Sequence, residues 1–316
     1  MNKSCNLTAE NVRLIRMAME LPVFVIGLVL NGIALVVFCC KGRWTETQIY
    51  MTNLVISDFA LLLSLPFKMY SYTHQWTFGN DLCALLVTVY YANMYVSILT
   101  IAAISFDRYI TIKHPFRAKR MRSPLKAGVL CILIWITVGT LSASFYMESV
   151  HDHKNQSEFK CFQKDSEEPF SRAFLLVLEI FGFVVPLITV AYCSAQSICT
   201  LQKEQHVSSQ EEKTRSVRII ASNGVVFFLC FTPFHVGLLL KFLIQTLSSQ
   251  DYCNLLQKAH TFLHVADCIA STNCCLDAIG YYFVAKAFRT NIVSPVQKNA
   301  QRIIRQNTHP CQLSAV

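Results

Sequence analysis

An acidic and a basic residue stand side by side where a long uncharged segment ends. Residues 82–103 carry no charge, and the stretch "ISFDRYITIKHP" at 104–115 then introduces Asp107 and Arg108. Such a pair could be a catalytic dyad, an ion pair that holds the fold, or part of a switch. A dyad is excluded because arginine stays protonated in proteins and no nucleophile motif accompanies the pair. As an exposed ion pair at a helix end, it would contribute only about 0–1 kcal/mol.

A second group of polar residues lies inside otherwise apolar segments. An ionisable side chain at membrane depth is costly, and it is usually functional or paired. Two carboxylates in this setting repel each other, so either one of them is protonated within a hydrogen-bond network or a bound cation offsets both charges. The members of this group all offer oxygen atoms to a cation: Asp58, Ser97, Asn273 and Asp277.

A third group combines basic and aromatic residues toward one end of the apolar segments. Lys68 is placed deepest, two residues after Pro66, where a lysine needs an anionic partner or must extend to the surface. An acidic ligand would be such a partner, and Glu179 is an internal alternative. Extension to the surface is the simpler explanation for the outermost basic residues. The other members are Tyr90, Tyr91, Met94, Arg172, His235, Lys241, Lys258, His260 and His264.

Seven long apolar stretches must position these three groups. The chain of 316 residues is 53% hydrophobic and 15% charged, whereas soluble domains carry roughly 25% charged residues. Backbone groups in lipid must be bonded internally, and about 20 apolar residues cross the hydrocarbon. Long unbroken runs therefore predict helices, not a barrel of short alternating strands. We expect an all-α membrane protein with spans at about 17–40, 47–70, 82–106, 125–147, 173–200, 217–245 and 256–284.

Charge and glycosylation signals predict the orientation of these spans. Cytoplasmic loops are enriched in Lys and Arg, and 18 of the 28 such residues fall in one set of loops: 41–46, 108–126, 202–218 and the tail from 285. The Asn-x-Ser/Thr glycosylation signals lie on the opposite side, at Asn2, Asn6 and Asn155. We therefore expect a multi-pass plasma-membrane protein with an extracellular amino terminus.

This orientation divides the chain into an extracellular tail over 1–16, a bundle over 17–284, and a membrane-surface helix with a cytoplasmic tail over 285–316. The formal net charge of +9 does not indicate a nucleic-acid partner, because no soluble basic module is visible.

Most of the 14 cysteines lie within apolar runs, where a thiol behaves as a small hydrophobic group. No C-x-x-C pair and no His/Cys cluster with zinc spacing is apparent. Four cysteines fall outside the runs or at their ends on the predicted extracellular side, and four cysteines allow three pairings. These are Cys5, Cys83, Cys161 and Cys253.

Characteristic residues in every predicted span resemble those of the rhodopsin-like (class A) G-protein-coupled receptors, and the resemblance covers essentially the whole chain. Within that family, "WTETQIYMTNL" (44–54) and "NCCLDAIGYYFVAKAF" (273–288) are similar to the kynurenic-acid-responsive orphan receptor. "LEIFGFVVP" (178–186) is similar to the lysophosphatidylinositol-responsive receptor. The characteristic residues are Asn31, Asp58, Asp107-Arg108-Tyr109, Trp135, Pro186, "CFTPF" at 230–234 and "LDAIGYY" at 276–282.

The resemblance implies a switch for G-protein binding at Asp107, Arg108 and Tyr109. Asp107 would hold Arg108 in the inactive state, and the released Arg108 would meet the terminal helix of the G protein while Tyr281 swings inward. The resemblance also implies that the four oxygen-donor residues around Asp58 bind an allosteric Na⁺. Ala278 stands where many relatives have the proline that kinks the seventh helix.

The resemblance further implies a disulfide between Cys83 and Cys161, which leaves Cys5 to pair with Cys253. It implies that "AKAFRTNI" (285–292) forms a short amphipathic helix on the membrane. Met94 stands where the kynurenic-acid-responsive receptor has an arginine thought to hold its ligand, so the same ligand preference is not implied.

The resulting hypothesis is a receptor, not an enzyme, that binds an extracellular anionic small molecule or lysophospholipid and promotes nucleotide exchange on a heterotrimeric G protein. Arrestin, receptor kinases and anionic membrane lipid are further expected partners, the lipid at the basic segment 113–126. The alternative is an ion-coupled transporter or channel lined by Asp58, Asp277 and Lys68. An odd number of spans without internal repeats argues against that alternative.

Overall fold

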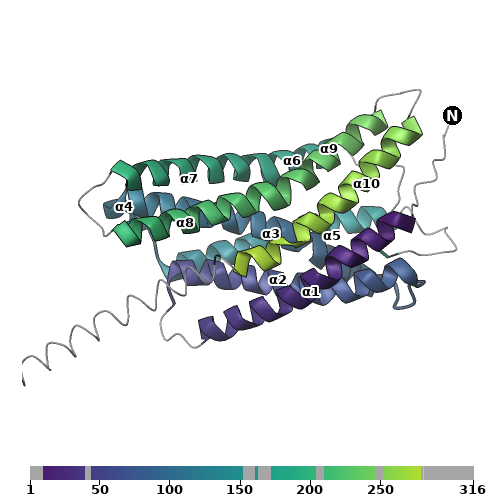
Figure 1. The fold of residues 1–316 in the computed structure, drawn as a ribbon, viewed down its shortest axis with the longest axis horizontal. Helices are drawn as coiled ribbons and strands as arrows, with labels where there is room; N and C mark the ends of the chain where they lie inside the picture. The colour runs from purple at the N-terminus through teal and green to yellow at the C-terminus, as the bar shows by residue number, and fades with distance from the viewer. Residues whose placement is uncertain are drawn as a thin grey trace, which may run out of the picture.

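The computed structural model describes residues 10–39, 44–151, 161–162, 172–203, 210–246, 252–278 and 280. These residues form long helices that run back and forth along one common axis (Figure 1). In chain order the helices are α1 (Glu10–Cys39), α2 (Glu46–Thr73), α3 (Asn80–Lys113), α4 (Pro115–Met121), α5 (Pro124–His151), α6 (Arg172–Glu179), α7 (Val185–Lys203), α8 (Gln210–Val226), α9 (Thr232–Thr246) and α10 (Tyr252–Ser271).

Two five-residue π-helical segments join consecutive helices into longer rods. η1 (Ile180–Val184) connects α6 to α7, and η2 (Phe227–Phe231) connects α8 to α9. Pro186 and Pro233 follow shortly after η1 and η2, and neither can donate a hydrogen bond to the carbonyl four residues earlier, which lies inside the π-helical segment in both cases. The wider turn accommodates the missing bond, and such turns often occur at functional sites.

Among the described residues, six rods are long and apolar enough to cross a membrane: Val12–Cys39, Glu46–Thr73, Asn80–Lys113, Pro124–Ala143, Arg172–Lys203 and Ser216–Thr246. They correspond to the first six predicted spans. The seventh rod, α10, packs against α1 and α9 but is more polar. Its helix ends at Ser271, turns at Thr272 and resumes at 273–278, so the predicted span at 256–284 is interrupted.

Helix α1 extends beyond the first predicted span. It begins at Glu10, within the stretch 1–16 that the sequence predicts as an extracellular tail. The expected membrane-surface helix and cytoplasmic tail at 285–316 lie outside the described residues, as do the glycosylation signals at Asn2, Asn6 and Asn155.

The central helix α3 packs against α2, α5 and α7. Asn53 of α2 joins three helices, because its amide nitrogen donates to Thr100 of α3 at 2.8 Å and its oxygen accepts from Trp135 of α5 at 2.9 Å. Gly182 in η1 allows a close approach to α3, since a Cβ at this position would lie 2.9 Å from the ring of Tyr95. Buried polar bonds and small residues thus fix how these helices pack.

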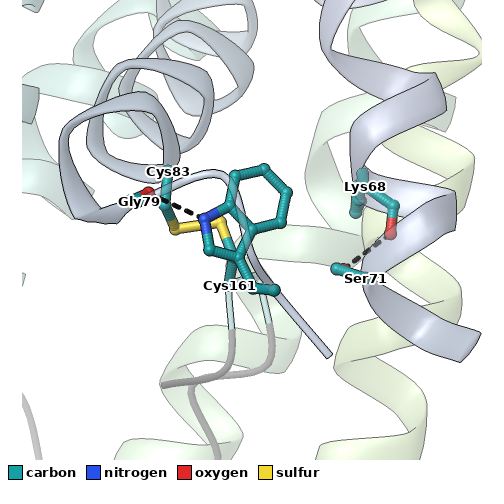
Figure 2. Close-up of a disulfide and its surroundings, with 6 residues drawn as sticks. Lys68, Ser71, Gly79, Cys83 and Cys161 are labelled. Atoms are coloured by element: carbon teal, nitrogen blue, oxygen red, sulfur yellow. Dashed lines mark hydrogen bonds between the residues drawn. A yellow bond between two sulfur atoms is a disulfide. The ribbon is translucent and has the colours of Figure 1, made fainter. Parts of the chain in front are cut away.

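A disulfide links α3 to a connecting segment at one end of the bundle. Cys83 and Cys161 are bonded, with their Cα atoms 5.8 Å apart, which confirms the predicted pair (Figure 2). The indole nitrogen of Trp76 donates to the carbonyl of Gly79 at 2.7 Å beside this bond. We call this end of the bundle the disulfide end and the opposite one, where Arg108 lies, the Arg108 end.

Candidate functional site

Lys68 lies inside the bundle toward the disulfide end and is only 1% exposed. Its ammonium nitrogen is 2.7 Å from a carboxylate oxygen of Asp267 on α10 and 3.0 Å from one of Glu20 on α1. It also lies 3.7 Å from the centre of the Tyr90 ring on α3, a cation–π contact. One lysine of α2 is therefore bound to three other helices.

Neighbouring tyrosines and an arginine complete this Lys68 cluster. The hydroxyl of Tyr90 donates to Asp267 at 3.0 Å, and the hydroxyl of Tyr72 donates to Glu20 at 2.9 Å. The guanidinium of Arg16 lies 4.1 Å from the centre of the Tyr72 ring. The negative charges of Glu20 and Asp267 balance the positive charges of Arg16 and Lys68. The cluster is therefore neutral in formal charge without a ligand.

Glu179, the internal alternative to an acidic ligand as the partner of Lys68, does not pair with Lys68 in the structure. Glu179 instead lies 3.1 Å from Nδ1 of His235, joining the fifth rod to the sixth. His235 is fully buried and stacks on Phe183, with ring centres 4.2 Å apart. Sequence analysis missed Glu20 and Asp267, although each is an acid within an apolar segment, which is the signal that could have found them.

The predicted ligand-binding residues divide between the Lys68 cluster and its surroundings. Tyr91 packs edge-to-face on Tyr90, with ring centres 5.2 Å apart, and also borders the apolar core that contains Met94 and Phe231. Lys241 is buried near the disulfide end of α9. His264 contacts His260 on α10, whereas Arg172 and Lys258 are exposed, as expected for residues that extend to the surface.

The oxygen-donor residues predicted from the sequence are all buried in the middle of the bundle: Asp58, Ser97, Asn273 and Asp277. The amide nitrogen of Asn93 bonds to Asp58 at 3.3 Å and to Ser57 at 3.1 Å, and Ser57 contacts Ser97 at 3.4 Å. The structure therefore connects α2 and α3 through a mid-bundle polar cluster.

In the helical stretch 273–278 that follows α10, several polar atoms of this mid-bundle cluster have no hydrogen-bond partner in the protein. Both polar atoms of the Asn273 side chain and one oxygen of Asp277 are buried without a hydrogen-bond partner. Buried groups of this kind require a water, an ion or a proton. Carboxylate, amide and hydroxyl oxygens suit a small hard cation, so the residues present fit a Na⁺ ion.

At the Arg108 end, Asp107 does not pair with Arg108. Its carboxylate accepts two bonds from Arg122, at 2.7 and 3.1 Å, and Arg122 also lies 3.3 Å from Glu46 at the start of α2. Arg108 donates to the hydroxyl of Thr47 in the same turn of α2. The expected Asp107–Arg108 pair is therefore wrong for this structure, because adjacent helical residues point in different directions.

A capping box sets the position of this first turn of α2. Thr45 accepts a bond from the backbone nitrogen of Gln48, and the Gln48 side chain accepts one from the backbone nitrogen of Thr45 at 2.9 Å. Glu46 and Thr47 are thereby held against the end of α3. We call this set the Arg108 network: Glu46, Thr47, Asp107, Arg108 and Arg122.

Two other predicted features are described only in part. Tyr109 packs against Tyr192 of α7, with ring centres 5.9 Å apart, whereas Tyr281 lies outside the described residues. Cys253 is disulfide-bonded, but its predicted partner Cys5 lies outside the described residues, so that pairing stays a prediction.

The amino-acid sequence matches one family model and several known proteins. The family model described as "7 transmembrane receptor (rhodopsin family)" matches residues 30–281. The chain is 35% identical to G-protein coupled receptor 55 of Homo sapiens over 95% of its length and 94% of that protein. It is 37% identical to lysophosphatidic acid receptor 6 of Gallus gallus, covering 90% and 92%, and 38% identical to G-protein coupled receptor 35 of Homo sapiens, covering 84% and 82%.

The ion pairs of Lys68 predict how substitutions in the cluster change the free energy of unfolding. Replacing Lys68 with Met leaves two buried carboxylates without their shared cation, which should destabilise the protein by about 3–5 kcal/mol. Neutralising the acids as well, in Glu20→Gln/Lys68→Met/Asp267→Asn, should recover most of that loss. Unfolding of the purified protein in detergent measures both effects, with exposed Lys258→Met as the matched control. Equal stabilities of the Lys68→Met and Lys258→Met variants would contradict the assignment.

Proposed function

The chain belongs to the rhodopsin family of seven-transmembrane receptors, and we propose that it transmits the binding of an extracellular acidic ligand to a heterotrimeric G protein. It is a G-protein-coupled receptor of the plasma membrane, not an enzyme, and family membership favours this function over a transporter or channel. The proposal is carried by one observation: α2 and α3 each contribute to both the Lys68 cluster and the Arg108 network.

We place the disulfide end outside the cell and the Arg108 end inside. A persistent disulfide is typical of the oxidising extracellular side, and the Lys and Arg excess lies in the loops at the other end. Lys68 and Glu46 are 22 residues apart on α2, which corresponds to about 33 Å of helix. A displacement of α2 at the outer cluster would therefore reach the inner network along one continuous helix.

The ligand that this outer end supports is an acid, such as an anionic small molecule or a lysophospholipid. Two of the similar proteins are named lysophosphatidic acid receptors, 6 and 4. In this chain, the acidic group of a ligand must compete with Glu20 and Asp267 for Lys68. Binding would thus exchange an internal ion pair for an external one and loosen α1 and α10 from α2. A screen of lysophosphatidic acid and small organic acids against Gα reporters tests the ligand class.

At the inner end, release of Arg108 is the proposed output. Arg108 is held by Thr47, while Arg122 occupies the carboxylate of Asp107 and reaches Glu46. A G protein that binds Arg108 would stabilise the released state, and a ligand shifts this equilibrium only by its difference in affinity for the two states. Movement of the sixth rod at η2 and Pro233 would open the space for the G protein.

The mid-bundle cluster is proposed to hold Na⁺ through Asp58, Ser97, Asn273 and Asp277. A bound cation supplies the positive charge that two neighbouring carboxylates need. The protein's own residues tie α2 to α3 through Asn93 and present the unpaired Asn273 and Asp277 groups from the α10 side. This site would favour the resting arrangement.

Substitutions in the Arg108 network test the proposed output. Arg108→Ala should abolish nucleotide exchange on Gα. Arg122→Gln should lower basal exchange, because it frees the carboxylates of Asp107 and Glu46 to hold Arg108. Exchange is measured with a labelled GTP analogue and the receptor in lipid nanodiscs, and exposed Arg120→Gln is the matched control. Retained exchange in Arg108→Ala, or ion flux in vesicles without any exchange, would remove the proposed function.

Sodium dependence tests the mid-bundle site. Replacing choline with Na⁺ should raise the thermal stability of the purified receptor and lower its basal nucleotide exchange. Asp58→Asn should remove both responses, and Asp81→Asn, an exposed acid at the start of α3, should retain them. A sodium response that persists in Asp58→Asn would show that the ion acts elsewhere.

A further inference from the structure

Two histidines on α10 come together at the disulfide end of the bundle. His260 and His264 are four residues apart, so they occupy the same face of the helix. Their Nε2 atoms form a hydrogen bond at 3.1 Å, and their rings are nearly perpendicular, at 86°. His260 is buried, whereas His264 is partly exposed, so the pair can be reached from outside the bundle.

The distance between the two nitrogens matches the spacing imposed by a shared metal ion. Zinc binds imidazole nitrogen at about 2.0–2.1 Å, and two such ligands at a tetrahedral angle are about 3.3 Å apart. One Nε2 carries the proton of this hydrogen bond, so a metal ion would release that proton to solvent and take a lone pair from each Nε2. Two histidines at this spacing on a helix are also the core of known zinc motifs.

We propose that His260 and His264 form a binding site for a divalent transition-metal ion, for which Zn²⁺ is the best match. Borderline ions of this kind prefer imidazole, whereas Na⁺ and Mg²⁺ prefer oxygen. The sequence placed both histidines in the basic and aromatic group at this end of the bundle but did not indicate that their rings meet.

The charges around the pair are compatible with a bound cation. Lys258 lies two residues before His260, about 200° around the helix, and is exposed on another face. Asp267 lies about one turn deeper than His264, within the charge-balanced Lys68 cluster. The field at the pair is therefore not dominated by a neighbouring lysine of α10.

The pair supplies two of the ligands of a zinc ion. No group of three or more His, Cys, Asp and Glu residues suited to a metal occurs among the described residues. Two protein ligands leave positions for water or for an acidic group from outside. Since the pair lies near the Lys68 cluster on α10, the ion would bind an acidic ligand on its way to Lys68. This last step rests on the proposed receptor function, whereas metal binding itself does not.

The experiment uses Zn²⁺ alone with the purified full-length receptor in nanodiscs. Binding is followed by zinc titration calorimetry and by the visible absorption of Co²⁺ placed in the same site, with chelator reversal. Wild type should show one saturable site. His264→Gln, which keeps a hydrogen-bonding side chain, should weaken binding by at least about tenfold and lose the Co²⁺ spectrum. His74→Gln, an exposed histidine at the end of α2, should bind like wild type.

The outcomes separate this inference from the proposed function. His264 is partly exposed, so its Gln variant should fold even if a His260 variant does not. Wild-type affinity in His264→Gln, or no saturable binding in wild type, would overturn the metal site while leaving nucleotide exchange intact. If wild type binds zinc, His264→Gln loses that binding and the protein shows no nucleotide exchange under any condition, the metal site is supported and the proposed receptor function is refuted.

Discussion

The arrangement of the bundle depends on the burial of one lysine. An ammonium group in a low-dielectric interior is tolerated only when negative groups surround it closely, and Lys68 finds them on Glu20 and Asp267. Because these residues come from α1, α2 and α10, satisfying one charge brings together helices that are far apart in the sequence. Tyr90 adds α3 through a cation–π contact and a hydrogen bond to Asp267.

This arrangement explains how an outer event could reach the inner face. The helix that carries Lys68 begins at the turn where Thr47 holds Arg108 and Glu46 meets Arg122. The helix that carries Tyr90 carries Asp107 and Arg108 near its other end. A ligand that exchanges the partners of Lys68 acts on two rods whose other ends form the inner network. The mid-bundle polar cluster lies between these ends and includes residues of the same two helices, such as Asp58 and Asn93.

Much of the fold could be predicted from the sequence, because span length and apolar composition follow directly from the bilayer as a solvent. The Cys83–Cys161 pair and the burial of Asp58 and Asp277 also agree with the structure. The partners of Lys68 could not be predicted, because no sequence pattern states the register of one helix against another. Adjacency in sequence suggested the Asp107–Arg108 pair, yet neighbouring residues on a helix face different ways, and Arg122 pairs with Asp107 instead.

Coupling between the two ends is the central claim, and a double-mutant cycle on basal nucleotide exchange tests it most directly. The cycle compares wild type, Asp267→Asn, Arg122→Gln and the double variant in nanodiscs with the same Gα. Residues that belong to one connected switch should give a coupling free energy above about 0.5 kcal/mol despite their distance. Strictly additive effects of the two substitutions would show that the Lys68 cluster and the Arg108 network act independently, which would contradict the account.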